Sequence, residues 1–74
     1  MKDARLTRIR KKLAKQLLKL RKKKQISRKD LAKGIGVSYN YYLTVERGEK
    51  KLGLNSLIKA ARILGVDVKD LIEF

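Results

Sequence analysis

The sequence predicts an all-α domain of five helices. Apolar side chains recur at spacings of three and four residues in each candidate segment, which is the period of an amphipathic helix. No segment shows the alternation of apolar and polar residues that is typical of a half-buried strand. Capping residues and glycines lie at the ends of these segments. At 74 residues the chain has the size of one small domain, and we expect residues 1–74 to form it.

The longest predicted helix spans residues 4–24. One apolar stripe runs along it, through Leu6, Ile9, Leu13, Leu17 and Leu20. Basic residues occupy most of the other positions, and the last four, residues 21–24, are all cationic. Positive charge at the C-terminal end of a helix interacts favourably with the helix dipole.

A second helix is predicted from about Arg28 to Ile35. Ser27 precedes it as a candidate N-cap, and Asp30 lies three residues further on, at the capping-box position. Gly36 follows at the point where the chain must reverse.

A third helix is predicted from about Tyr39 to Arg47. Ser38 is its candidate N-cap, and Gly48 ends it. Tyr42 and Val45 lie three residues apart, on one face that we expect to be buried.

The last two helices complete the predicted fold. One spans about Leu54 to Leu64 and is ended by Gly65. Asp67 and Asp70 then repeat the capping-box spacing at the start of a short helix. The apolar residues of this short helix are Val68, Leu71, Ile72 and Phe74.

The charge of the chain indicates a polyanionic partner. There are 21 Lys and Arg residues against 7 Asp and Glu residues, which gives a net charge of +14 and a pI near 10.5. The charge is also uneven, because residues 1–24 hold 12 bases and one acid, whereas residues 65–74 hold one base and three acids. The plainer alternative is that a Lys-rich surface only keeps a small domain soluble.

Composition disfavours several other classes of protein. The chain has no Cys and no His, which removes the usual zinc ligands and the commonest general base, so we expect no metal, no cofactor and no enzymatic activity. The lack of Cys fits a cytoplasmic protein. No apolar run suits a secretory signal or a membrane span. The first helix alone could lie on an anionic membrane, but that interpretation leaves the following 50 residues unexplained.

Three motifs together carry a family resemblance. They are S-x-x-D-L-A-x-x-x-G-V-S from Ser27, V-E-R-G from Val45, and L-x-x-L-I-K-A-A-R-I-L-G-V-D-V-K-D-L from Leu54. This pattern resembles the Cro/phage-repressor (XRE-like) helix-turn-helix family over about residues 13–71. The resemblance implies a compact lambda-repressor-like domain with its helix-turn-helix in the second and third helices. It also implies an ion pair between Arg21 and Glu46.

The resemblance places the third helix, about residues 39–47, in the major groove of DNA, where every base pair presents a distinct pattern of donors and acceptors. Burial of Tyr42 and Val45 leaves the outward positions for contact with DNA. The family's base-contacting positions correspond to Tyr39, Asn40 and Thr44, and an apolar Leu43 between them suits thymine methyls.

Other residues are expected to contact the DNA backbone. Arg28 occupies a position where the family often has a Gln that touches phosphate. Hydroxyls and amides at helix N-termini also bind phosphate. Tyr41 could equally pack on the surface of the domain. The predicted backbone contacts are Ser27, Arg28, Ser38, Tyr41, Arg47, Lys50 and Lys51.

The chain departs from the family pattern at two places. Leu52 stands where the family's loop commonly has a Pro, so we expect a less constrained loop. Residues 1–12 extend the first helix beyond the family's usual start, and the apolar residues there need cover from this chain or a second one. We expect a homodimer on inverted half-sites about 34 Å apart. Its predicted interface is Leu71, Ile72 and Phe74.

The sequence therefore predicts a bacterial or phage-like transcriptional regulator, of repressor or controller type, that binds specific sequences in double-stranded DNA. The Y-x-x-x-V-E-R-G spacing from Tyr41 also resembles controller proteins of restriction–modification systems. The chain shows no sensor domain, so we expect no small-molecule ligand, and through DNA it would associate with the nucleoid. The alternative is a non-specific nucleic-acid or ribosome-associated basic protein.

Overall fold

The computed structural model describes residues 4–72, and these form five α-helices without a strand. The first four helices begin and end within one residue of their predicted bounds, and the predicted all-α class is confirmed. The helices are α1 (Ala4–Lys23), α2 (Arg28–Ile35), α3 (Tyr39–Glu46), α4 (Leu54–Leu64) and α5 (Val68–Ile72).

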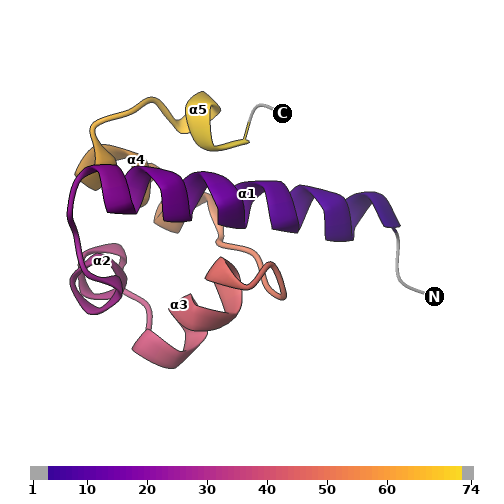
Figure 1. Ribbon diagram of the computed structural model, residues 1–74, viewed down its shortest axis with the longest axis horizontal. Helices are drawn as coiled ribbons and strands as arrows, with labels where there is room; N and C mark the ends of the chain where they lie inside the picture. Colours follow the sequence, from indigo (N-terminus) through magenta and orange to yellow (C-terminus); the bar gives the residue numbers. More distant parts are fainter. Residues whose placement is uncertain (1–3, 73–74) are drawn as a thin grey trace.

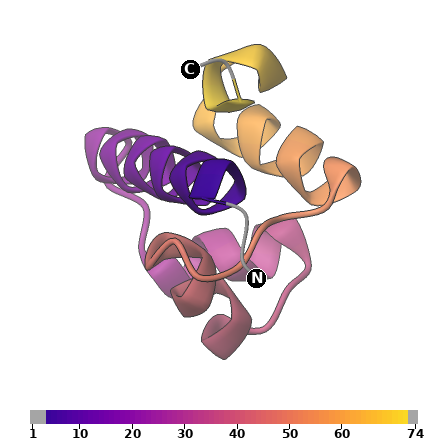
Figure 2. The same ribbon diagram turned by 90° about the vertical axis from the view of Figure 1, so that its right-hand side faces the viewer.

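Helix α1 runs along the length of the molecule, with α2 and α3 on one side of it and α5 on the other (Figure 1). Seen from the end, α2 and α3 lie below α1, α5 lies above it, and α4 lies beside it (Figure 2). Helix α2 also packs against α4 and closes the core. The N-terminal part of α1 projects beyond the other helices.

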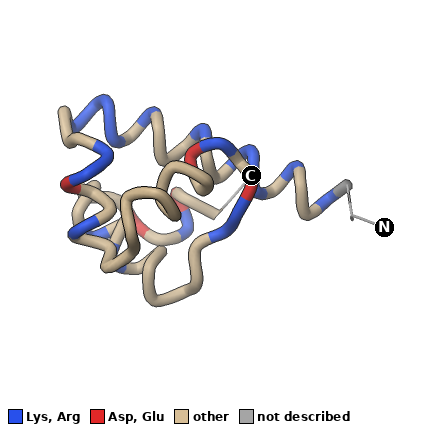
Figure 3. Tube along the Cα trace, turned by 90° about the horizontal axis from the view of Figure 1, so that it is seen from below, with Lys and Arg blue, Asp and Glu red and all other residues tan. Residues whose placement is uncertain are grey.

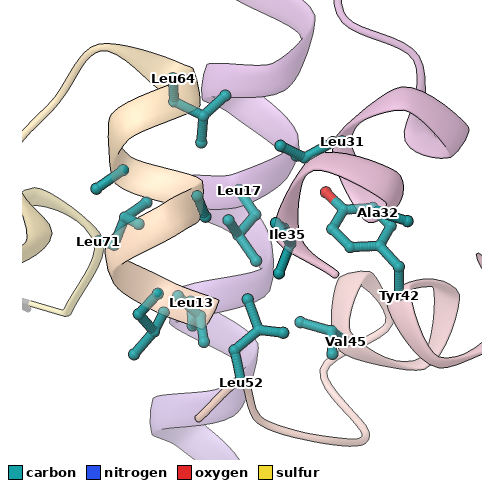
Figure 4. Close-up of a cluster of buried hydrophobic side chains, with 13 residues drawn as sticks. Leu13, Leu17, Leu31, Ala32, Ile35, Tyr42, Val45, Leu52, Leu64 and Leu71 are labelled. Carbon is teal, nitrogen blue, oxygen red and sulfur yellow. The ribbon is translucent and has the colours of Figure 1, made fainter. Parts of the chain in front are cut away.

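The core draws side chains from every helix. Leu17 of α1, Leu31 of α2, Tyr42 of α3, Leu64 of α4 and Leu71 of α5 are all fully buried in it (Figure 4). Burial of one such side chain contributes about 1.5–3 kcal/mol. The same cluster therefore fixes α3 against α1 and α2, which sets the orientation of the helix-turn-helix.

Both predicted N-caps of the helix-turn-helix are present. The Ser27 hydroxyl accepts a hydrogen bond from the Asp30 amide at 3.0 Å. The Ser38 hydroxyl accepts one from the Tyr41 amide, also at 3.0 Å. Gly36 ends α2 with a φ of 89°, a left-handed conformation that favours glycine. These local signals define the turn between α2 and α3.

The apolar stripe of α1 is only partly buried. Leu13 and Leu17 lie in the core, but Leu6 remains 50% exposed and Ile9 46% exposed. Within the part of the chain that the structure describes, α5 does not cover them, because its Leu71 points into the core instead.

The predicted dimer interface needs a correction. Leu71 has no exposed surface, so its assignment to a contact with a second chain is wrong. Ile72 is 45% exposed and remains available for such a contact. Phe74 lies outside the described residues.

The loop between α3 and α4 is held against the body of the domain. Leu52, at the position where the family commonly has a Pro, is only 4% exposed. Its buried side chain anchors the loop, which is therefore more constrained than the sequence predicted. Gly48 lies against α1, where an added Cβ would come within 3.0 Å of the Lys11 side chain. None of the helices described between residues 4 and 72 is long and apolar enough to cross a membrane.

Candidate nucleic-acid interface

The first turn of α3 presents polar and aromatic side chains to solvent. Tyr39 is 45% exposed, and Asn40 is also exposed. The capped N-termini of both α2 and α3 lie at this end of the motif. A helix that contacts bases through its N-terminal residues needs such an exposed first turn.

The second turn of α3 is less exposed than the sequence predicts. Leu43 and Thr44 were expected to point outward, but both are half-buried. Leu43 lines a hollow with Leu18 of α1 and Arg28 of α2. The Thr44 hydroxyl donates a hydrogen bond to the Tyr41 carbonyl oxygen at 2.6 Å. Leu43 loses exposure because α3 packs against α1 at this point.

A buried carboxylate joins three helices. Glu46 of α3 has an exposed side-chain fraction of 6%, and its Oε2 lies 2.8 Å from Nε of Arg21 on α1. Its Oε1 accepts a second hydrogen bond, from Nε of Arg28 on α2, at 3.1 Å. Arg21 is itself 9% exposed and also donates from Nη1 to the Ile26 carbonyl oxygen. The ion pair that the resemblance implies is therefore present, with Arg28 as a third member.

The electrostatics of Glu46 follow from these neighbours. Burial alone would raise the pKa of its carboxyl group, but the Tyr42 hydroxyl and the guanidinium groups of Arg21 and Arg28 lower it by more. The pKa of Glu46 therefore lies below its ordinary value. The Tyr42 hydroxyl is buried beside this cluster without a hydrogen bond of ordinary geometry, and burial strongly raises its pKa.

Sequence reasoning missed the contact between Arg28 and Glu46. Arg28 was assigned only to phosphate contact, because the two residues lie 18 positions apart on different helices. No local pattern marks this pair. The side chain of Arg28 is still 47% exposed, so it can face an external anion while it holds Glu46.

Tyr41 has a clear structural contact. Its hydroxyl donates a hydrogen bond to the Lys51 carbonyl oxygen at 2.6 Å, and Nζ of Lys50 lies 5.7 Å from the centre of its ring. These contacts tie the loop after α3 to the middle of that helix. The packing role that the sequence left open for Tyr41 is therefore observed.

The predicted backbone-contacting residues lie near both ends of α3. Arg47, Lys50 and Lys51 are exposed in and before the loop that follows α3. The Ser27 and Ser38 hydroxyls cap their helices and lie at exposed positions. In the part of the chain that the structure describes, no cluster of acidic side chains could hold a metal ion.

Three solved structures resemble this one. The clp gene regulator ClgR of Corynebacterium glutamicum matches with a TM-score of 0.80 and 30% identity, over 85% of this chain and 67% of that one. The hypothetical transcription factor NHTF from Neisseria matches with a TM-score of 0.78 and 31% identity, over 86% of this chain and 74% of that one. An HTH_3 family transcriptional regulator from Vibrio cholerae matches with a TM-score of 0.78 and 29% identity, over 89% of this chain and 37% of that one.

No curated protein matches the chain. The family model HTH_3, described as helix-turn-helix, matches residues 17–71 and so includes the capped α2–α3 motif and the core helices around it. This match agrees with the prediction, made from composition and motifs, that the chain is a DNA-binding domain and not an enzyme. The chain belongs to the HTH_3 helix-turn-helix family.

Proposed function

We propose that this chain is a sequence-specific transcriptional regulator, of repressor or controller type, that inserts α3 into the major groove of double-stranded DNA. The observation that carries the proposal is the exposed first turn of α3, presented by helices that Glu46 locks together. The regulators of similar structure support the same function.

The base contacts come from the exposed end of α3. Asn40 has the amide geometry that pairs bidentately with adenine. Tyr39 offers its ring to thymine methyls and its hydroxyl to a base or a phosphate. Leu43 and Thr44 are half-buried and lie one turn further along, so they contribute at the edge of the contacted segment.

The backbone contacts come from the residues around α3. Ser27, Arg28 and Ser38 lie at the N-terminal ends of α2 and α3, where amides and positive charge attract phosphate. The loop after α3 contributes a second set, on the other side of the recognition helix. This set comprises Arg47, Lys50 and Lys51, together with Tyr41 of α3, whose hydroxyl is bonded to the loop at Lys51.

The regulator binds inverted half-sites as a homodimer, which doubles the few base contacts of one domain. The exposed Ile72 at the end of α5, beside the acidic end of the chain, is the core of the proposed contact. Because this end of the chain carries little positive charge, a contact there reduces the repulsion between two chains of net charge +14. The homodimer is contradicted if sedimentation shows that the protein is a monomer both in free solution and when bound to DNA.

Selection of bound sequences from random DNA, followed by variants at two kinds of position, tests this function. Asn40→Ala is expected to weaken binding to the selected site by about 1–3 kcal/mol and to relax the preference at one position. Lys50→Ala is expected to weaken binding to all sequences alike. It is also expected to lower the magnitude of the log–log salt slope by about the contribution of one phosphate contact.

The alternative function is non-specific binding to nucleic acid or ribosomes. It predicts that the selection enriches no sequence and that the wild-type chain binds the selected and random DNA equally at physiological salt. Unchanged affinity and preference in Asn40→Ala would show that α3 is not the recognition helix.

A further inference from the structure

A row of connected hollows leads away from the helix-turn-helix onto α1. The first lies between the starts of α2 and α3, and it shares Arg28 with a second, beside Leu43. The second shares Arg47 and Leu18 with a third, which reaches Lys11 and Lys15 on α1.

A fourth hollow continues the row toward the N-terminal end of α1. It shares Lys11 and Lys15 with the third and adds Arg8. Because neighbouring hollows share lining residues, they follow one another from the exposed turn of α3 to the N-terminal part of α1. We call the part lined by Arg8, Lys11, Lys15 and Arg47 the α1 groove.

The charge of this groove is almost entirely positive. Among the described residues, Arg8, Lys11, Lys15 and Arg47 are exposed, and no carboxylate forms an ion pair with any of them. The carboxylate that lines the groove belongs to Glu46, which is buried and already holds two arginines. Lys and Arg positions recur along the whole of α1 (Figure 3). A groove of one charge sign focuses its field on an anionic ligand.

We infer that the α1 groove is a second phosphate-binding site, which holds the DNA backbone beyond the segment that α3 contacts. This inference rests on the proposed function, since it places the duplex against α3. Arg8 and Lys15 are seven residues apart, or about 10 Å along a helix. One strand carries a phosphate every 3.4 Å of duplex axis, so the site adds about three phosphates to the contact.

The groove favours DNA over other polyanions because it opens onto the recognition helix. A duplex seated on Tyr39 and Arg28 already lies at one end of the row of hollows. The exposed Leu6 and Ile9 lie on the same helix and would suit an anionic membrane, which is the competing ligand that the experiment must distinguish.

The test compares two triple variants with the same change of charge. The groove variant is Arg8→Gln, Lys11→Gln and Lys15→Gln. The control is Lys59→Gln, Arg62→Gln and Lys69→Gln, which removes the same residue types from exposed positions on α4 and α5. Binding to the selected site is measured from low to high salt. The site is embedded in duplexes that are shortened from each end in steps of one base pair.

The groove variant is expected to lower the magnitude of the log–log salt slope by about 2.7, or about 0.9 for each lost contact, while the control keeps the wild-type slope. The wild type and the control lose affinity when the flanking three or so base pairs are removed, and the groove variant does not. Preference for the selected sequence stays the same in all three proteins. If the triple variant does not fold, Arg8→Gln with Lys15→Gln is expected to change the slope by about 1.8.

Equal salt slopes and equal length dependence in the two triple variants would overturn the inference. It is also overturned if the groove variant binds DNA like the control and instead loses binding to vesicles of phosphatidylserine. A wild-type chain without sequence preference contradicts the proposed function separately. The salt slopes of the two triple variants are in that case compared on a duplex of random sequence.

Discussion

The two halves of α1 use the same residue types for opposite purposes. In the C-terminal half, Leu17 is fully buried and Arg21 is held by Glu46 at 2.8 Å. In the N-terminal half, Leu6 is 50% exposed and Arg8 has no acidic partner among the described residues. The apolar stripe and the basic residues continue through both halves without a break in the sequence.

The difference between the halves comes from their neighbours. Helices α2, α3 and α5 surround the C-terminal half, so its side chains build the core and fix the recognition helix. The N-terminal half projects past them (Figure 1), so the exposed side chains of Arg8 and Lys11 can meet a ligand. A basic amphipathic helix therefore has no single role, and each half must be tested separately.

The largest expected effect is on the buried half. Leu17→Ala is expected to lower the free energy of unfolding by about 2–5 kcal/mol, because it leaves a cavity under α3 and α4. Leu6→Ala, the matched change on the exposed half, is expected to cost less than about 0.5 kcal/mol. Urea denaturation of both variants measures the difference. Similar losses for both would mean that Leu6 is covered.

The next effect concerns the charge network. Glu46→Gln is expected to lower the free energy of unfolding by about 2–3 kcal/mol, because it leaves the buried Arg21 without a counter-charge. Arg28→Gln is the control, and its cost stays below about 1 kcal/mol because Arg28 is 47% exposed. If the two variants lose equal stability, burial does not set the strength of this network.

The same network predicts a pH dependence. Glu46 has a lowered pKa in the folded chain, so it stabilises the fold at pH values above its ordinary pKa of 4.5. This contribution is lost as the pH falls through the lowered pKa. Thermal unfolding between pH 7 and pH 2 is expected to show a smaller acid destabilisation in Glu46→Gln than in the wild type. Parallel curves contradict the lowered pKa.

The smallest effect is predicted at the edge of this network. Tyr42→Phe is expected to change the free energy of unfolding by less than about 1 kcal/mol, because the buried hydroxyl makes no hydrogen bond of ordinary geometry. Chemical denaturation measures it, with Val45→Ala as a core control that loses more. A loss well above 1 kcal/mol in Tyr42→Phe would show that its hydroxyl bonds to Glu46.

The helices and their caps were predictable because their signals are local. Ser27 and Ser38 cap amides three residues away, and Gly36 and Gly65 adopt the left-handed conformation at helix ends that glycine permits. The spacing of apolar residues gave the period of each helix.

Packing decided the residues that the sequence misplaced. Leu43 lost exposure to α1, and Leu71 entered the core instead of facing a second chain. Thr44 is half-buried, and its hydroxyl is bonded to the Tyr41 carbonyl oxygen. Arg28 gained Glu46 as a partner across 18 positions. Periodicity identifies a helical face but does not say how far a neighbouring helix reaches across it.

The sequence by itself determined five helices, their ends, the positive charge and the family, since these depend on residues near one another in the chain or on a pattern of spacing. Only the tertiary structure decided which charges are neutralised and which are left for a ligand. Seven acidic residues cannot pair with 21 basic ones, so the fold selects the pairs. It buries Arg21 with Glu46 and leaves Arg8, Lys11 and Lys15 along an open groove.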